Sequence, residues 1–421
     1  MIDLMLHWSE WIKPSAGLPT VQWSLLLALA AAAGHLLQRY LGLPKVLGYS
    51  AVGALAGFSG YTTATWPLDG IGQFMVELGL SIVLFEAGGR LTLRWFRHNP
   101  MLLAQSLAEA ILTYLAADWV LQLFDVDAGL RMPLALLLVA TSPAVIMRVA
   151  SDLRASGPVT ERAITLAALN TLYVLALGGV MARLLGRTPD LLADAIYPVV
   201  LLLAASVLVG ALLAMALRKA LQLMSPTSEN TAVLQLALIA AGTTLAANFG
   251  GSAPLTALLA GLLLKTWHPR PWSSPRQFGT ASAILTMLMF VLVSMAAAQA
   301  AWNWQAWSLI AALVLARALA KLSAIALAGL GSGASAKQAL WTAGAMWPMS
   351  AVALLLVSQF VSFAPAIGTD IAAIALPLIL FMEVLGALMA VLALQRAGEA
   401  GRPPAARRIN LKTEGDPTDA A

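Results

Sequence analysis

The chain has 421 residues, of which 60% are hydrophobic and only 11% are charged, whereas a typical soluble domain is roughly 25% charged. It has no cysteine, so disulfides, thiolate metal sites and covalent haem attachment are excluded. The four histidines lack metal-ligand spacing, and no nucleotide-binding loop, nucleophile elbow or zinc-protease helix is present. The composition therefore predicts a membrane protein that is not an enzyme and needs no cofactor.

Long apolar runs recur along the whole chain, and about 20 residues suffice to cross the hydrocarbon core. They predict an all-α polytopic membrane protein with about thirteen transmembrane helices. The run 253–267 is short and could be tilted or partly re-entrant. In chain order the predicted spans are 21–40, 44–60, 70–90, 101–124, 132–152, 161–185, 191–222, 230–249, 253–267, 279–300, 304–329, 336–362 and 369–395.

The distribution of Lys and Arg predicts the orientation in the membrane. With the N-terminus outside and the C-terminus in the cytoplasm, nineteen of the 25 basic residues fall in inner loops or the tail and four fall outside. This bias follows the positive-inside rule, so the net charge of +5 reflects topology and not nucleic-acid binding. Residues 1–20 are predicted to form a short outer segment, 21–395 the transmembrane domain, and 396–421 a disordered cytoplasmic tail.

Two of the apolar runs are interrupted by proline and small polar residues. The first interruption is Thr141-Ser142-Pro143, and the second contains Pro348 and Ser350. Proline inside a helix removes a hydrogen-bond donor, and in lipid the freed peptide groups are tolerated only inside protein or beside a water-filled cavity. A matched pair of broken helices points to the binding site of a secondary transporter.

Ionisable residues inside membrane spans are costly and usually functional. Glu86 lies four residues before Arg90, a spacing that also suits a purely structural ion pair. Glu109 lies deep in its span, but the sequence identifies no partner for it. The other ionisable residues predicted within spans are Glu77, Asp118, Arg317, Lys321 and Glu383.

Arg317 and Lys321 are four residues apart and share one face of the 304–329 helix. Both lie near or inward of the middle of the span, so we predict a buried role. They are expected to neutralise carbonyl dipoles that point inward, or to pair with a buried carboxylate. The candidate carboxylates are Glu77, Glu86 and Glu383.

The order of these features resembles the monovalent cation:proton antiporter superfamily, the sodium/hydrogen exchanger fold, over roughly residues 20–395. The resemblance implies inverted repeats, two crossing broken helices, and a bundle that moves against a scaffold that usually forms a homodimer. The motifs that carry it are Gly42-Leu43-Pro44 with Gly48-Tyr49 and Gly53 to Gly57, Glu77-Leu78-Gly79, Leu84-Phe85-Glu86-Ala87-Gly88, Thr141-Ser142-Pro143-Ala144-Val145, Pro348-Met349-Ser350, Arg317 with Lys321, and Glu383-Val384-Leu385-Gly386.

One position departs from the family pattern. In the family, the helix after the first break carries an aspartate preceded by Asn, Asp or Gln, and this aspartate binds cation and proton in turn. Here the matching residues are Asn170 and Thr171, and neither side chain exchanges a proton at physiological pH. A proton switch must then come from Glu86, Glu77, Glu383 or Lys321, or it is absent.

The residues around the first break suggest an oxygen-lined cavity. Carbonyls of the break, the Thr141 and Ser142 hydroxyls, and Asn170 with Thr171 offer the ligands that hard monovalent cations accept. The structural alternative for such residues is helix packing or hydrogen bonding to a carbonyl of the same helix. A weak inverted repeat, in which spans 2 to 6 match spans 9 to 13, places the two breaks at equivalent positions.

These observations favour a secondary transporter in the inner membrane that exchanges Na⁺ or K⁺ for protons by alternating access. Its expected partners are these ions, the lipid bilayer and a second copy of the chain, with no nucleic acid. Two alternatives stay open because the aspartate is missing. One is a cation or solute carrier without proton coupling, and the other is a membrane sensor on the same fold that transports nothing.

Overall fold

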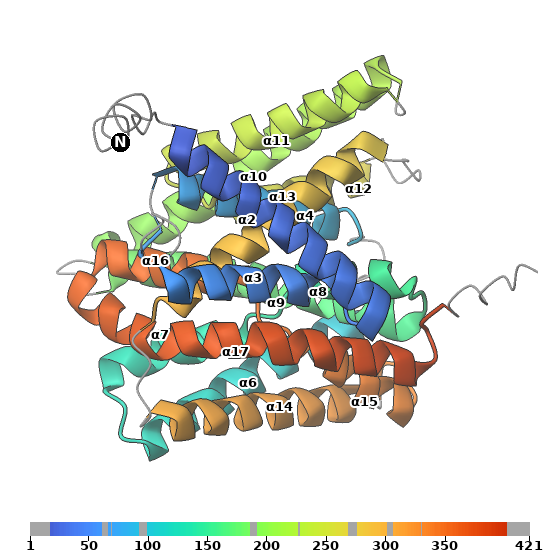
Figure 1. Cartoon of the computed structure of the whole chain (residues 1–421). Helices are drawn as coiled ribbons and strands as arrows, with labels where there is room; N and C mark the ends of the chain where they lie inside the picture. The colour runs from blue at the N-terminus through green and yellow to red at the C-terminus, as the bar shows by residue number, and fades with distance from the viewer. Residues whose placement is uncertain are drawn as a thin grey trace, which may run out of the picture.

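The computed structural model describes residues 17–60, 66–68, 70–91, 99–185, 192–225, 228–267, 276–300, 306–329 and 331–401. Within these ranges every regular element is helical, as Figure 1 shows. Most of the predicted outer segment 1–20 and most of the predicted tail lie outside the described residues. The elements are α2 (Gly17–Leu36), η1 (Leu37–Leu41), α3 (Lys45–Ser59), α4 (Gly70–Gly88), α6 (Pro100–Leu123), α7 (Ala128–Val139), α8 (Pro143–Leu153), α9 (Pro158–Leu184), α10 (Leu192–Leu223), α11 (Glu229–Asn248), α12 (Ala253–Trp267), α13 (Arg276–Ala298), α14 (Ala306–Gly329), α15 (Ala336–Ala345), α16 (Ala351–Phe363) and α17 (Pro365–Ala397).

Each of the thirteen predicted spans coincides with a helix or a pair of helices. Among the described residues, ten helical stretches are long and apolar enough to cross a membrane. The other three predicted spans fall on α3, on α12 and on the broken pair α15–α16, which are shorter. The all-α membrane class is therefore confirmed, while length and composition support ten crossings and leave the count of thirteen a prediction.

The helices pack as two groups. The core bundle, defined here as α6–α9 and α14–α17, has its most extensive contacts between α6 and α14, α16 and α17, and α6 and α7. The scaffold bundle, α2–α4 and α10–α13, is held mainly by the pairs α3–α13 and α4–α12. In Figure 1 the core helices α6 and α14 lie at the bottom and the scaffold helices α10, α11 and α12 at the top.

Glycine permits the closest approach in the scaffold. A Cβ atom on Gly88 of α4 would lie 2.2 Å from the carbonyl oxygen of Leu258 on α12. A Cβ on Gly261 of α12 would lie 2.2 Å from the carbonyl oxygen of Phe85 on α4. Small residues that let backbones touch are a common means of helix association in membranes.

The contacts also follow the predicted inverted repeat. In that repeat α3 corresponds to α12, α4 to α13, and α9 to α17. The contact of α3 with α13 then has its equivalent in α12 with α4, and α16 with α9 has its equivalent in α8 with α17. The fourth span and its counterpart, α6 and α14, pack directly on each other.

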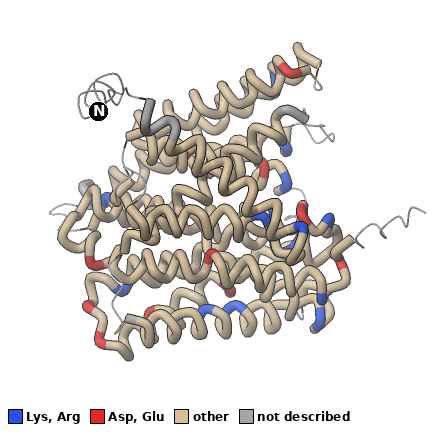
Figure 2. Tube along the Cα trace, viewed as in Figure 1, with Lys and Arg blue, Asp and Glu red and all other residues tan. Residues whose placement is uncertain are grey.

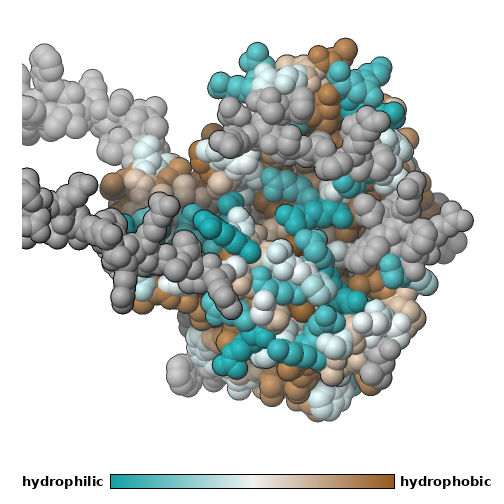
Figure 3. All heavy atoms as spheres, turned by 90° about the vertical axis from the view of Figure 1, so that its right-hand side faces the viewer, coloured by the Kyte–Doolittle hydropathy of each residue, from teal (hydrophilic) through white to brown (hydrophobic). Residues whose placement is uncertain are grey.

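Lys and Arg residues gather at one end of the bundle, on the right in Figure 2. This end, which we call the basic end, contains the junction of α8 and α9 with Arg148, Arg154 and Arg162, and the start of α15 with Lys337. Figure 3 looks onto it and shows hydrophilic residues across its surface. The distribution agrees with the charge bias that predicts the orientation.

The start of the predicted disordered tail needs correction. Helix α17 continues to Ala397, and the next residues are docked on the junction of α8 and α9. The Glu399 carboxylate accepts hydrogen bonds from the Val159 and Thr160 backbone N–H groups and the Thr160 hydroxyl, each at 2.7 Å. The N-cap residue of α9, Gly157, has no side chain to satisfy these donors, and a Cβ there would lie 2.4 Å from Cδ of Glu399.

Glu399 therefore caps α9 from a distant part of the chain. Glu399→Ala removes a charged acceptor from two first-turn amides, which we expect to cost about 1.5 kcal/mol locally. Hydrogen exchange at Val159 and Thr160 should become about tenfold faster. Glu229→Ala, which removes an exposed glutamate from the first turn of α11, should leave both rates unchanged. Equal rates in the Glu399 variant and the parent would contradict a capping role.

Candidate functional site

The two broken helices meet at one point in the core bundle. Helix α7 ends at Val139 and α8 begins at Pro143, while α15 ends at Ala345 and α16 begins at Ala351. The Ser142 N–H donates to the Pro348 carbonyl oxygen at 2.9 Å, which joins the two interruptions directly. Both predicted breaks are therefore present, and they lie side by side.

The serines at the breaks act as helix caps. The Ser142 hydroxyl accepts a hydrogen bond from the Val145 N–H at 3.2 Å, and the Ser350 hydroxyl accepts one from the Val352 N–H at 3.2 Å. An N-cap side chain satisfies one of the free donors in the first turn of a helix. The Ser142 and Ser350 side chains are thus engaged in starting α8 and α16. Pro143 occupies the first turn of α8, and Pro348 contributes the carbonyl that accepts the Ser142 N–H.

Arg317 of α14 holds the two breaks together. Its guanidinium donates to the Leu138 carbonyl at 2.8 Å, to the Ala140 carbonyl at 2.9 Å and to the Trp347 carbonyl. These acceptors come from both broken helices, and the Arg317 side chain is only 1% exposed. Of the two roles predicted for this residue, neutralising carbonyl dipoles is the one in the structure.

Lys321, one turn further along α14, forms a buried ion pair with Glu109 of α6. Both side chains are fully buried. The lysine also donates to the Thr141 hydroxyl at 2.9 Å, and Glu109 accepts a hydrogen bond from Thr113 at 3.1 Å. Removing two charges from water is expensive and such a pair is weak evidence for stability, so a functional role is the better explanation.

Asn170 and Thr171 of α9 complete the cluster. The Asn170 amide nitrogen donates to Oε2 of Glu109, whereas Lys321 and Thr113 donate to Oε1. The same nitrogen lies 3.4 Å from the Thr141 hydroxyl. The Thr171 hydroxyl is bonded to the Thr141 and Ala167 carbonyls at 3.0 and 2.9 Å. Asn170 Oδ1 is buried and has no hydrogen-bond partner, which leaves one acceptor in the cluster available to a ligand.

The other predicted carboxylates lie elsewhere. Glu383 accepts hydrogen bonds from Ser50 and Ser294 of the scaffold at 2.9 and 2.8 Å, and Glu77 accepts one from Gln73 at 2.9 Å. The expectation that Arg317 or Lys321 pairs with Glu77, Glu86 or Glu383 is therefore wrong. The carboxylate beside Lys321 is Glu109 of α6, and not one of the glutamates of α4 or α17.

The predicted ion pair between Glu86 and Arg90 is also absent from the salt bridges of the described residues. Arg90 instead lies 3.7 Å from a carboxylate oxygen of Glu161, at the start of α9. Glu86 is half-buried on α4 and lies near Arg148 and Ser282. It belongs to the basic end and not to the cluster at the crossing.

Glu109 is the residue whose importance the sequence did not establish. A signal was present, because α6 carries Gln105, Glu109 and Thr113 at intervals of four residues, and all three are fully buried. A polar stripe of this kind on a membrane helix faces the protein interior.

A model of the family described as "Sodium/hydrogen exchanger, transmembrane" matches residues 25–395. The chain is also similar to solved structures of the sodium proton antiporter MjNhaP1 from Methanocaldococcus jannaschii. The structure at pH 8 has a TM-score of 0.67 at 17% identity, covering 91% of this chain and 98% of that one. An electron-microscopy structure gives the same score and identity with coverage of 88% and 95%. No curated protein matches this sequence.

The position of Arg317 predicts a structural penalty for its loss. Arg317→Met leaves three buried carbonyls without their donors, at about 1 kcal/mol or more each. We expect the free energy of unfolding to fall by about 3 kcal/mol, with a lower Tm in detergent. Arg317→Lys should fall between this variant and the parent, because an ammonium cannot reproduce the planar fork.

The control is Arg396→Met, which changes an exposed arginine near the end of α17. Its Tm should match the parent value. A Tm for Arg317→Met equal to that of the control would mean that the carbonyls at the two breaks do not depend on Arg317.

Proposed function

The chain belongs to the sodium/hydrogen exchanger family, and from that premise we propose that it exchanges a monovalent cation, Na⁺ or K⁺, for protons by alternating access. The observation that carries the proposal is the buried pair of Glu109 and Lys321 beside the crossing of the broken helices. An exchanger needs a site that holds either a proton or a cation. This pair contains the titratable groups such a site requires.

Glu109 supplies the carboxylate that the family resemblance assigns to the missing aspartate. Thr171 occupies that position and its hydroxyl is bonded to two carbonyls. Glu109 comes from a different helix, and its carboxylate accepts a hydrogen bond from the side-chain amide of Asn170, the residue next to Thr171. The carboxylate is thus supplied by α6 instead of α9, so Glu86, Glu77 and Glu383 are not needed as carriers.

The charge at the site supports an exchange of one proton for one cation. With Lys321 protonated, the pair is neutral. A monovalent cation that binds Glu109 while Lys321 gives up its proton leaves the same net charge in the low-dielectric core. Binding a cation beside a protonated lysine would add an uncompensated buried charge, which is strongly disfavoured.

The neighbouring oxygens suit a hard monovalent ion. The Glu109 carboxylate and the Thr141 hydroxyl both lie within hydrogen-bonding distance of the Asn170 amide nitrogen, and the Oδ1 of the same side chain is a buried oxygen without a partner. Lys321 donates to two of these three residues, so its ammonium competes for the same ligands. Competition of this kind couples cation binding to proton release and argues against both an uncoupled carrier and a sensor.

The setting of the site completes the proposal. The basic end would face the cytoplasm of an inner membrane, with the N-terminus outside and the C-terminus inside. The core bundle would move against the scaffold bundle, through which two copies of the chain would pair. The charge distribution in Figure 2 and the separate packing of the two bundles support this arrangement.

Glu109→Gln tests the carrier role directly. In vesicles with an internal pH dye, a Na⁺ or K⁺ gradient should drive proton flux with the parent protein. A neutral amide has no negative charge to hold the cation that displaces the Lys321 proton, so we expect the flux in the variant to fall by about a hundredfold or more. Comparing the two cation gradients identifies the ion that is transported.

Glu77→Gln is the matched control, because Glu77 is another glutamate within a predicted span and it lies outside the cluster. It should retain the parent flux. Normal proton flux with Glu109→Gln would refute the proposal. Cation-tracer uptake without any pH change in the parent would favour the uncoupled carrier, and no flux of either kind would favour the sensor.

A second test separates charge from proton exchange at Lys321. Lys321→Arg keeps a positive charge that cannot be removed, so the cation cannot replace it and tracer exchange should fall about a hundredfold. Lys321→Gln removes that charge and should keep measurable cation flux, with Glu109 holding either proton or cation. The Tm of both variants distinguishes a loss of folding from a loss of exchange. Parent-like exchange by the arginine variant would exclude lysine deprotonation from the cycle.

A further inference from the structure

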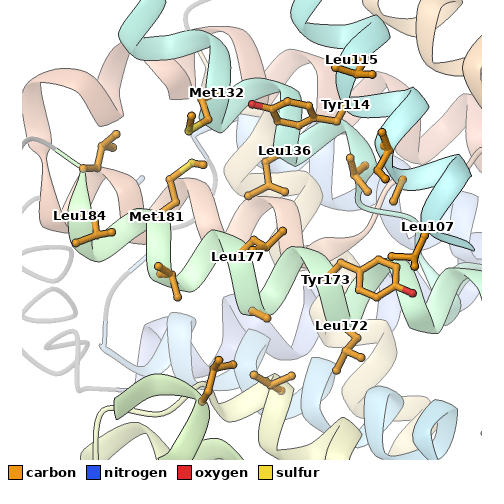
Figure 4. Close-up of a pocket in the computed structure, with 18 of the residues that line it drawn as sticks. Leu107, Tyr114, Leu115, Met132, Leu136, Leu172, Tyr173, Leu177, Met181 and Leu184 are labelled. Atoms are coloured by element: carbon orange, nitrogen blue, oxygen red, sulfur yellow. The ribbon is translucent and has the colours of Figure 1, made fainter. Parts of the chain in front are cut away.

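A groove of about 980 Å³ separates the core bundle from the scaffold bundle on one side of the molecule. Its core wall is formed by α6, α7 and α9, and its scaffold wall by α10 and α12. Figure 4 shows side chains from these helices pointing into the space, among them Tyr114, Met132, Leu177 and Met181. The volume lies at the upper end of the range for small-molecule pockets, about 300–1,000 Å³.

The lining is almost wholly hydrocarbon. Leucine, isoleucine, valine, alanine and methionine make up every lining position except two tyrosines, Tyr114 and Tyr173, and no lining residue is charged. Such a surface offers very few hydrogen bonds to water, so water inside it would be poorly held. The groove therefore selects an apolar occupant.

The mouth of the groove continues into surfaces that face lipid. On α6, Leu107, Ile111 and Leu115 follow one another at four-residue intervals and are 46%, 57% and 55% exposed. Large apolar side chains exposed in this pattern on a spanning helix mark its lipid-facing side. On α10 the equivalent pair is Leu203 and Val207. The groove thus opens sideways, toward the acyl chains of the bilayer.

We propose that this groove binds one phospholipid acyl chain between the two bundles. Hydrocarbon is the medium against which the mouth opens, and it matches the almost wholly apolar lining. The proposal does not depend on ion exchange, because it follows from the shape, the depth and the chemistry of the groove.

The bound chain lies close to the crossing of the broken helices. Leu172 lines the groove and directly follows Thr171, and the carbonyl of the lining residue Val139 accepts the Thr141 hydroxyl at 3.3 Å. An acyl chain here fills the space next to the polar cluster and keeps water out on that side. It also blocks closure of the core bundle onto α10 and α12 while the chain occupies the groove.

The first experiment counts bound lipid. The full chain is reconstituted with phosphatidylcholine that carries a nitroxide near the end of one acyl chain, and electron paramagnetic resonance measures the motionally restricted fraction. Ala176→Phe fills the groove from α9 and should remove one restricted lipid per chain. Ala311→Phe adds the same ring to an exposed position of α14, and it should remove none.

The second experiment asks whether the groove is dry and does not rely on the bulky variant. Since the chain has no cysteine, Leu177→Cys places a unique thiol at a position that is 59% exposed in the parent. A bimane label at this thiol should be quenched by the nitroxide lipid. The unlabelled thiol should react slowly with a charged, membrane-impermeant reagent.

Three results would overturn the proposal. The first is an unchanged number of restricted lipids in Ala176→Phe, and the second is an equal loss in Ala311→Phe. The third is rapid reaction of the thiol at position 177 with the impermeant reagent, which would identify a water-filled opening. None of these measurements uses transport, so they succeed or fail separately from the exchange proposed for Glu109 and Lys321.

Discussion

Peptide groups that leave a helix inside hydrocarbon must find partners within the protein, and this constraint organises the structure around the crossing of the broken helices. Arg317 supplies three of the required donors, and the Ser142 N–H with the Pro348 carbonyl supplies a direct link between the breaks. The serine caps at positions 142 and 350 satisfy the first turns of α8 and α16. The result is a rigid polar centre in an apolar bundle.

That centre explains how the chain can lack the family aspartate and still carry a titratable site. The position of the carboxylate in the sequence matters less than its position in space. Helices α6 and α14 pack on each other, so Glu109 and Lys321 meet beside Thr141 and Asn170. In the exchange that we propose, a charge that must stay paired in low dielectric ties the cation, the proton and the lysine to one another.

The separation into two bundles has a second consequence, which concerns the lipid. Contacts within each bundle are extensive and include glycine-mediated backbone approach in the scaffold. Between α9 and the helices α10 and α12 the packing leaves an apolar groove that is open to the bilayer. If an acyl chain occupies this boundary as proposed, closure of the core bundle on α10 and α12 requires the chain to leave, but it breaks no close-packed core.

The sequence by itself determined the helical membrane class and the location of both breaks, because hydrophobic length and proline act locally. It also identified Arg317, Lys321 and Asn170 as inward-facing. Tertiary structure alone decided the partner of Lys321, since Glu109 is 212 positions away in the chain. It likewise decided that Glu399 caps α9 and that Glu383 lies apart from the cluster around Glu109 and Lys321. Pairing across a bundle depends on which helices adjoin and at what rotation, and no local pattern encodes that geometry.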